Sequence, residues 1–374
     1  MRTKKSIYNF ISDVFPFFII SALSFFRIRF VLDSFGTEIN GLLQLVVQIF
    51  SYLTLAEAGF GTAVMYKLYK PLAENKKNEI ISIVNGSKKI FKKIALIMTI
   101  SSIICAFLLP LFIAKGSLNN SFIINLFLFY AAHYLIEYFL VLPYTTLLQA
   151  DQNQYVVNAY KNIIKILFSI LELILIYNKV DLLLIISINI LFSLVYSYFI
   201  IRKTIKIYPW LNNKCDKEDT SSVSMTKDVF VHKISSLVFS KTDSIILSFY
   251  SLNYVTIYTS YNYILDFLTN VVSKMYNAVK SSYCNIVALN KTGEDEKIFN
   301  MLLSFSFFLA IFCAVTFQYT VNPVINLWIG EKYVLNESAV FLFSLIIIGK
   351  IITNPIFMAR DSKGLYKETK MFTR

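Results

Sequence analysis

Long apolar blocks, separated by short polar segments, follow one another along the chain. Most blocks hold roughly twenty residues or more, and a helix of that length crosses the roughly 30 Å of a bilayer's hydrocarbon. The blocks lack the regular alternation of apolar and polar residues that is typical of transmembrane β-strands. The pattern predicts membrane-spanning helices over about 10–32, 41–66, 94–114, 121–148, 156–177, 180–201, 228–250, 254–289, 300–321 and 338–358.

The composition excludes a water-soluble globular enzyme. Of the 374 residues, 56% are hydrophobic and 16% are charged, whereas a soluble domain carries about 25% charged residues. The four cysteines form no CxxC motif, and no nucleophile motif, paired carboxylates or nucleotide-binding loop is recognisable. We therefore expect an all-α polytopic bundle of about ten spans that is not an enzyme and holds no cofactor or metal.

Basic residues are unevenly distributed between the two sides of the predicted membrane. The chain has 36 Lys and Arg against 23 Asp and Glu, a net charge of +13, which in a soluble protein would indicate nucleic acid binding. With a cytoplasmic N-terminus, the predicted outer segments hold only Lys115, Lys179 and Lys332, and most other basic residues lie in inner segments. This distribution follows the positive-inside rule, so we expect the N-terminus and residue 374 in the cytoplasm and no nucleic acid partner.

One inner segment, GSKKIFKKIA at 86–95, interleaves lysines with apolar residues. This composition suits an amphipathic segment that lies on anionic membrane lipids. Retention of the segment in the cytoplasm explains the same lysines equally well.

The two halves of the chain resemble each other weakly. Residues 148–155 align with 358–365, and residues 70–76 align with 286–292. Such internal similarity is typical of transporters that are built from repeats.

A polar stretch halfway along the chain, NNKCDKEDTSS, indicates a linker between two lobes. We predict an N-terminal lobe of six transmembrane helices at 1–203, a cytoplasmic linker at 204–226 and a partial C-terminal lobe of four helices at 227–374. The lobes would enclose a central cavity. Because an equal second lobe would need two further helices, we expect a truncated chain or a fragment.

Several short motifs follow one another along nearly the whole chain. They are FGTEINGL at 35–42, AEAGFGTA at 56–63 with KPL at 70–72, LQADQ at 148–152, KTDSIILS at 241–248 and LWIG at 327–330. In the order and spacing of these motifs the chain resembles the polysaccharide biosynthesis or O-antigen (Wzx-type) flippases of the multidrug/oligosaccharidyl-lipid/polysaccharide (MOP) exporter superfamily. Members of that family have twelve or fourteen helices in two lobes around a central cavity, so a chain of ten departs from the pattern.

The resemblance implies a flippase of the bacterial inner (plasma) membrane. It would move undecaprenyl-pyrophosphate-linked oligosaccharide repeat units to the outer leaflet for surface polysaccharide assembly, by ion-coupled alternating access. The implied partners are the lipid-linked oligosaccharide, anionic membrane lipids, a polysaccharide polymerase and glycosyltransferases. A multidrug or metabolite antiporter of the same superfamily and a non-functional truncated member stay open as alternatives. A membrane polysaccharide polymerase would normally need a large external loop, and the predicted outer loops are short.

Ionisable residues within the predicted spans are candidates for function, because a charge at hydrocarbon depth is costly. Arg27 and Arg29 lie in the first span and point about 200° apart on a helix, so only one of them can face a cavity. The alternative is that one or both extend to the lipid headgroups. A cavity arginine would suit the substrate because guanidinium binds pyrophosphate bidentately.

The eighth predicted span carries the clearest polar stripe. Asp266, Asn270, Lys274, Asn277 and Ser281 are three or four residues apart, which places them on one helical face. Such a face lines either a wet pathway or a polar seam between helices. In a pathway, Lys274 would attract the pyrophosphate, and Asp266 would pair with Lys274 or carry a coupling proton.

Other polar groups in the spans extend the list of candidates. The seventh span places His232, Ser236, Ser240 and Asp243 on one face, and Asp243 lies opposite Arg27 in the repeat alignment, as a partner across the cavity would. His133 and Glu137 form either a titrating pair or part of the packing against neighbouring tyrosines. Gln44 and Gln48 mark a milder polar face. Basic residues outnumber acidic ones in the first, seventh, eighth and tenth spans, which favours an anionic substrate over a cationic drug.

Overall fold

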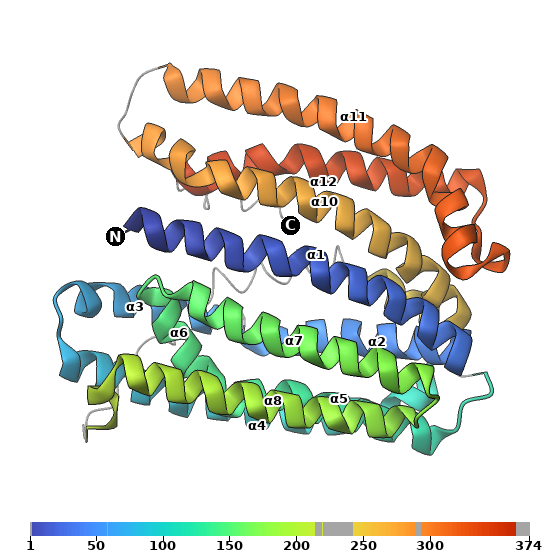
Figure 1. The fold of residues 1–374 in the computed structure, drawn as a ribbon, viewed down its shortest axis with the longest axis horizontal. Helices are drawn as coiled ribbons and strands as arrows, with labels where there is room; N and C mark the ends of the chain where they lie inside the picture. The colour runs from blue at the N-terminus through green and yellow to red at the C-terminus, as the bar shows by residue number, and fades with distance from the viewer. Residues whose placement is uncertain are drawn as a thin grey trace. The chain divides into compact units, whose positions relative to one another are not determined.

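The computed structural model describes residues 2–57, 59–114, 116–213, 219, 242–288 and 293–363 (Figure 1). Every regular element in these ranges is helical. The first part of the chain forms α1 (Arg2–Phe35), α2 (Thr37–Leu53), η1 (Thr54–Glu57), α3 (Phe60–Ala73), α4 (Lys77–Phe112), α5 (Asn120–Ile136), η2 (Glu137–Val141), α6 (Leu142–Ala150), α7 (Gln154–Tyr177), α8 (Leu182–Ile207) and η3 (Pro209–Asn212). The later part forms α10 (Leu252–Ala288), α11 (Glu294–Ile329), η5 (Glu331–Tyr333) and α12 (Glu337–Lys363).

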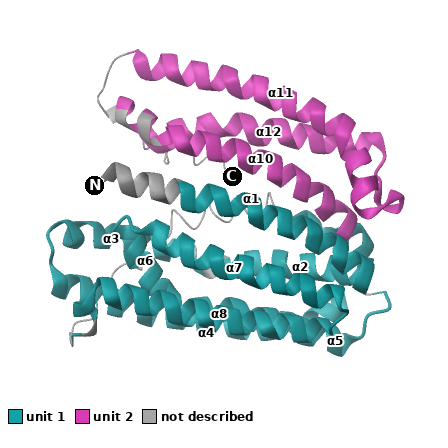
Figure 2. Ribbon diagram, in the orientation of Figure 1, with its two compact units in different colours: residues 1–255 teal, residues 256–374 magenta. Residues whose placement is uncertain are grey.

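The chain divides into two compact units, residues 1–255 and residues 256–374 (Figure 2). Most of the predicted linker at 204–226 and much of the predicted span at 228–250 lie outside the described residues, together with His232, Ser236 and Ser240. The predicted lobe boundaries therefore stay a prediction.

The described helices include six segments that are long and apolar enough to cross a membrane. They are Ile11–Phe35, Lys77–Phe112, Asn120–Ala150, Leu182–Ile207, Glu294–Ile329 and Glu337–Lys363. The helices α7 and α10 are also long, with 24 and 37 residues, but they carry more polar and charged side chains. The sequence-based prediction of an all-α, multi-pass membrane bundle is confirmed.

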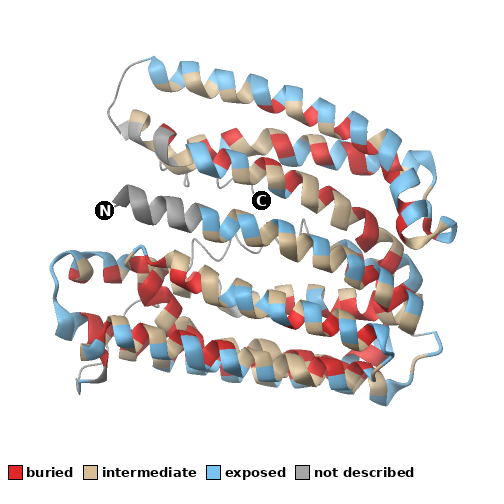
Figure 3. Ribbon diagram, in the orientation of Figure 1, coloured by how far each residue is buried: buried red, intermediate tan, exposed pale blue. Residues whose placement is uncertain are grey.

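One face of α4 shows where the apolar part of that helix begins. Lys89, Lys92 and Lys93 are exposed on it. From the next turn onward the exposed side chains are apolar: Leu96, Ile97, Ile100, Ile103, Ile104, Phe107, Leu108, Leu111 and Phe112. Figure 3 shows how buried and exposed positions alternate along the helices of this unit. The basic segment 86–95 is therefore a continuous part of a membrane helix, and its lysines end where the lipid-facing surface starts.

Two predicted spans are interrupted by irregular turns. The predicted span 41–66 is not one helix, because α2 ends at Leu53 and the chain passes through η1 and Gly59 before α3 begins. Gly59 has a φ of 98°, which a residue with a side chain adopts only at a cost. The predicted span 121–148 contains the π-helical turn η2 just before Pro143, whose ring and missing N–H disturb the helix ahead of it. The Tyr138 side chain of η2 lies beside Glu57 of η1, so the two interruptions are close to each other.

The first unit packs its helices around two hydrophobic clusters. The helix α1 lies along α7, α5 contacts α4 and α8, and α3 contacts α6. The larger cluster joins side chains of α2, α4, α5 and α8, and Phe50 stacks on Phe127 in it with ring centroids 5.0 Å apart. The smaller cluster joins α3, α4, α6, α7 and α8 around Leu68, Leu148 and Ile200.

One described residue of the predicted linker, Asp219, is fixed to the first unit. Its carboxylate accepts hydrogen bonds from Lys67 Nζ at 3.1 and 3.2 Å, and its backbone N–H donates to the Ser82 carbonyl at 3.2 Å. Gly86 allows this approach, because a Cβ atom there would lie only 2.0 Å from the Asp219 carbonyl oxygen. The glycine in the basic segment is thus explained by contact with the linker.

In the second unit, two buried tyrosines of α10 connect it to the neighbouring elements. Tyr261 is fully buried; its hydroxyl donates to Asn322 Oδ1 of α11 and accepts the Leu335 N–H at 2.9 Å. The Tyr276 hydroxyl contacts Ser306 Oγ of α11. The helices α11 and α12 pack against each other, and Phe343 of α12 stacks on the Tyr261 ring with centroids 5.5 Å apart.

The motif LQADQ forms the turn between α6 and α7, and a tyrosine after α8 holds this turn in place. The Tyr208 hydroxyl donates to Asp151 Oδ2 at 2.6 Å and accepts from Asn153 Nδ2 at 3.1 Å. Burial and the adjacent Asp151 carboxylate raise the pKa of Tyr208, so the phenol stays a neutral donor over the physiological pH range. This motif therefore has a structural role in the chain.

We expect Tyr208→Phe to lower the free energy of unfolding by about 1–3 kcal/mol, because Asp151 and Asn153 lose a buried partner. Thermal unfolding of the purified protein in detergent measures this loss. Tyr177→Phe is the control, since Tyr177 is 75% exposed in the same unit. Equal unfolding temperatures for the two variants would contradict a stabilising role of Tyr208.

Candidate functional site

The two arginines of α1 lie in different environments. Arg27 points into the first unit, with 21% of its side chain exposed, and its Nε donates to Glu172 Oε1 of α7 at 2.7 Å. Its Nη2 also donates to the Tyr130 hydroxyl of α5 at 3.5 Å. Arg29 is 50% exposed and lies 3.7 Å from Asp33 one turn later on the same helix. The expectation that only one of the two points inward agrees with this geometry.

The partner of Arg27 differs from the one that the repeat alignment indicated. Asp243 is exposed and does not contact Arg27. The actual partner, Glu172, has 9% of its side chain exposed and lies on α7, the helix that packs along α1. Helix packing within the unit thus places a nearer carboxylate beside the guanidinium, and a pairing of Arg27 with Asp243 across a cavity stays a prediction.

Glu172 belongs to a polar stripe on α7 that the sequence already contains. Its members, Asn158, Asn162, Lys165, Ser169 and Glu172, are three or four residues apart and so share one helical face. Asn162 Nδ2 donates to the Ser12 carbonyl of α1 at 3.0 Å, so both ends of this face contact α1. The same spacing of polar residues, three or four positions apart, marks both this stripe and the stripe at 266–281 in the sequence.

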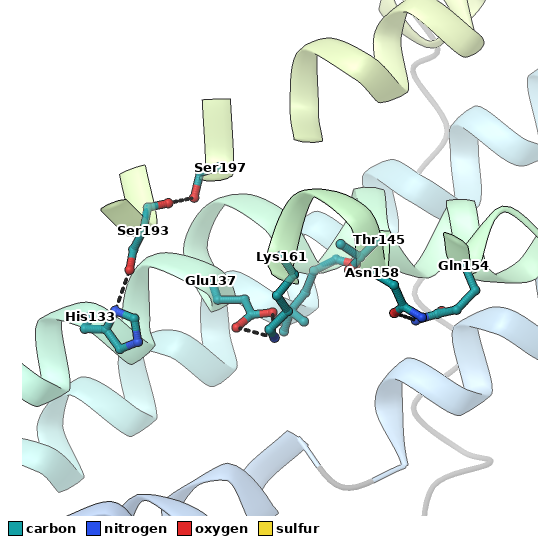
Figure 4. A network of polar contacts seen from close by, with 9 residues as sticks. His133, Glu137, Thr145, Gln154, Asn158, Lys161, Ser193 and Ser197 are labelled. Atoms are coloured by element: carbon teal, nitrogen blue, oxygen red, sulfur yellow. Dashed lines mark hydrogen bonds and ion pairs between the residues drawn. The ribbon is translucent and has the colours of Figure 1, made fainter. Parts of the chain in front are cut away.

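His133 and Glu137 each contact a different neighbouring helix (Figure 4). His133 Nδ1 hydrogen-bonds Ser193 Oγ of α8, and Glu137 accepts from Lys161 Nζ of α7 at 2.9 and 3.3 Å. The two side chains are thus not paired through a hydrogen bond with each other. They connect α5 and η2 to the two helices that pack beside them.

Gln44 and Gln48 of α2 are partly buried. The Oε1 atom of Gln48 is fully buried, and it has no hydrogen-bond partner within the described part of the chain. A buried carbonyl oxygen without a partner is costly at hydrocarbon depth and can accept a hydrogen bond from a water molecule or a ligand.

The polar stripe of α10 lies partly against α12 in the second unit. Asp266 Oδ1 pairs with Lys350 Nζ of α12 at 2.8 Å, so Lys350, and not Lys274, holds this carboxylate. Asn270 is exposed and Lys274 is partly exposed. Asn277 lines a pocket of about 240 Å³ between α10 and α12. The stripe therefore combines a polar seam between helices with side chains that stay accessible.

Ion pairs join helices in both units. In the first unit, Arg27 pairs with Glu172 and Lys161 with Glu137, and Lys165 lies on the same face of α7 as Glu172. In the second unit, the described residues on the adjoining faces of α10 and α12 include four cationic side chains and two carboxylates: Lys274, Lys280, Lys350 and Arg360 against Asp266 and Asp361. Because these cations outnumber the carboxylates, the face can attract an anion.

Comparison with known proteins gives a fold but no family. No protein-family model and no curated protein matches the chain. Among solved structures, it resembles the inward-facing conformation of a multidrug resistance MATE family transporter of the MOP superfamily, with a TM-score of 0.61, 14% identity, and coverage of 94% of this chain and 80% of that one. It also resembles the MATE multidrug transporter DinF-BH, solved as a complex, with a TM-score of 0.64, 14% identity, and coverage of 100% and 84%.

A third solved structure, of a MATE in the bent conformation, gives a TM-score of 0.60 at 13% identity, with coverage of 100% of this chain and 84% of that one. At such identities the likeness establishes the fold. The chain is a multi-pass helical membrane protein with the fold of MATE transporters.

We expect Arg27→Ala to destabilise the first unit by about 3–5 kcal/mol, because Glu172 would stay buried without its counter-ion. Thermal unfolding in detergent provides the measurement. Arg29→Ala, which removes an exposed pair, should change stability by less than about 1 kcal/mol. The double variant Arg27→Ala/Glu172→Ala should lose less stability than the two single variants lose together. Additive losses of stability would show that the two groups are energetically independent.

Proposed function

We propose that this protein is a flippase that moves undecaprenyl-pyrophosphate-linked oligosaccharides from the inner to the outer leaflet of the bacterial plasma membrane. The motifs in the sequence support this specific function, and the MATE fold supports transport by alternating access between two helical units. The cargo combines a diphosphate, hydroxyl-rich sugars and a long lipid chain. A suitable site therefore needs positive charge, amide or hydroxyl groups, and access from the bilayer.

The observation that carries the proposal is the excess of positive charge on the adjoining faces of α10 and α12. Lys350 holds Asp266, so Lys274 does not share that carboxylate. Lys274 is partly exposed on the same stripe, and a diphosphate is an anion that such a cation would attract. Asn270, one turn away from Lys274 and exposed, offers both a donor and an acceptor to sugar hydroxyls.

Ion coupling would act through carboxylates that are already paired. Protonation of Glu137 or Asp266 removes the charge that holds Lys161 or Lys350, so the contact between two helices weakens. His133 and Asp243 complete the set of coupling groups that we propose. Each of the two ion pairs joins different helices, so loss of a pair changes packing within one unit.

The reaction sequence defines the partners that we propose. Glycosyltransferases have to supply the lipid-linked oligosaccharide on the cytoplasmic side, and a polysaccharide polymerase has to consume it on the outer side. Anionic lipids would contact the exposed lysines of α4.

A multidrug antiporter is the second candidate, because two of the solved structures with this fold are described as multidrug transporters. The charge of the cargo distinguishes the two functions. A cationic drug requires an anionic site, whereas the described face of α10 and α12 has more cations than carboxylates.

We expect Lys274→Ala to slow transport of a lipid diphosphate oligosaccharide about tenfold, since a charge-assisted hydrogen bond contributes about 1.5–3 kcal/mol. The protein is reconstituted in liposomes, and oligosaccharide exposure is followed with a lectin that does not cross the membrane. Lys297→Ala is the matched control, because Lys297 is an exposed lysine of α11 in the same unit. Transport of a cationic dye in place of the lipid diphosphate, or an equal rate for Lys274→Ala and Lys297→Ala, would overturn the proposal.

A further inference from the structure

The pocket between α10 and α12 is lined by charged, amide and aromatic side chains from both helices. The two helices run side by side in the second unit (Figure 1). The pocket measures about 240 Å³, and its polar and aromatic lining includes Asn277, Lys280, Asn354, Phe357, Arg360 and Asp361. Residues 354, 357, 358 and 361 of α12 follow the spacing i, i+3, i+4 and i+7, so they form one continuous face of the helix toward α10.

Two cations share one carboxylate in this pocket. Lys280 Nζ lies 2.7 Å from Asp361 Oδ2, and Arg360 donates from Nε and Nη2 to Asp361 Oδ1 at 3.1 and 2.9 Å. Both carboxylate oxygens are therefore used, and the group keeps a net charge of about +1. Lys280 has three N–H donors and gives one of them to Asp361, so it can donate to a second anion.

The arginine is held in a fixed orientation. Its guanidinium lies over the Phe357 ring, 4.8 Å from the centroid, and its side chain is 20% exposed. A guanidinium that is stacked and hydrogen-bonded loses little further freedom when it binds a phosphate. Asn354 Nδ2 donates to the Lys350 and Ile351 carbonyls, which leaves its Oδ1 as an acceptor for a hydroxyl donor.

In the turn next to the pocket the exposed side chains of both helices change from apolar to charged, although Lys274 and Lys350 lie on the apolar side of this change. Met275 and Val279 of α10 are 49% and 44% exposed, and Lys280 follows directly. Ile356 and Phe357 of α12 are 43% and 47% exposed, and Arg360 follows one turn later. Such a change marks the boundary between hydrocarbon and headgroups, which is the depth at which lipid phosphates lie.

We propose that this pocket is a binding site for a phosphate ester, with Lys280 and Arg360 holding the phosphate and Asn277 and Asn354 hydrogen-bonding hydroxyl groups next to it. The ligand is either the phosphoglycerol headgroup of an anionic lipid or a free phosphate ester from the aqueous side. The site lies on the same charged face of α10 and α12 as the proposed cargo site but does not use Lys274, so binding here can be measured separately from transport.

A second ion pair between the same helices provides a matched control. Lys350 and Asp266 lie 2.8 Å apart, and the Lys350 side chain is 40% exposed, against 39% for Lys280. This pair has one cation for one carboxylate and no arginine. If ion pairs between α10 and α12 only fasten the helices together, substitution of Lys280 and Lys350 should have equal effects on anion binding.

The test uses the full chain in two binding assays. In the first, native mass spectrometry measures how much phosphatidylglycerol stays bound after purification from nanodiscs with equal amounts of phosphatidylglycerol and phosphatidylcholine. In the second, calorimetry measures binding of glycerol 3-phosphate to the protein in phosphatidylcholine nanodiscs. The variants are Lys280→Ala, Lys280→Arg, Arg360→Ala, Asp361→Asn and the control Lys350→Ala, each checked for monodisperse elution.

We expect Lys280→Ala and Arg360→Ala to bind at least fivefold less ligand in one or both assays. Lys280→Arg and Lys350→Ala should bind as much ligand as the unsubstituted protein. Asp361→Asn should increase binding, because it removes the competing carboxylate. Binding in the first assay alone identifies a lipid headgroup, and binding in the second identifies a soluble ester. No binding in either assay, or equal losses for Lys280→Ala and Lys350→Ala, would overturn the proposal.

Discussion

A charge or hydrogen-bonding group within hydrocarbon has to find its partner inside the chain, because no water is present there to supply one. The described ion pairs follow this constraint, whereas the buried Gln48 Oε1 has no partner among the described residues. Arg27 is matched by Glu172, Glu137 by Lys161 and Asp266 by Lys350, and each pair joins two different helices. The ion pairs therefore fix which helices lie side by side, in addition to balancing charge. Where cations exceed carboxylates, as around Asp361, the excess itself indicates where an external anion can be accommodated.

Much of the helical architecture could be predicted from the sequence, because apolar length is a direct physical requirement of a membrane span. The α10 and α12 helices correspond to predicted spans with small differences at their ends, and α11 extends beyond the predicted span 300–321 to Glu294 and Ile329. The interruptions at Leu53–Phe60 and at Glu137–Val141 were not predicted. Pro143 and Gly59 were visible in the sequence, but hydropathy averages over a window and does not respond to a local change of backbone geometry.

The candidate site was less predictable, because contacts between helices depend on rotation and packing. Periodicity alone indicated that Arg27 and Arg29 point in different directions, and the structure shows Arg27 as the inward one. The choice of Glu172 as its partner required knowledge that α7 packs along α1. Alignment of the two halves could not provide this, since equivalent positions in two repeats have no reason to touch. The partner of Asp266 could not be predicted from sequence spacing either. Lys274 lies on the same predicted helical face, but the carboxylate pairs with Lys350 on another helix.

The two interruptions in the first unit have a mechanical consequence. The helices that follow them, α3 and α6, contact each other and share the smaller hydrophobic cluster, around Leu68 and Leu148. Both continue from α2 and α5 through η1 and η2, and both pack with α4, α7 and α8, which run past them without a break. Tyr138 of η2 and Glu57 of η1 lie beside each other where the two interruptions meet. A change in tilt of α3 and α6 would concentrate at η1 and η2, because helices bend where their regular geometry is broken, and the uninterrupted α4, α7 and α8 would oppose it.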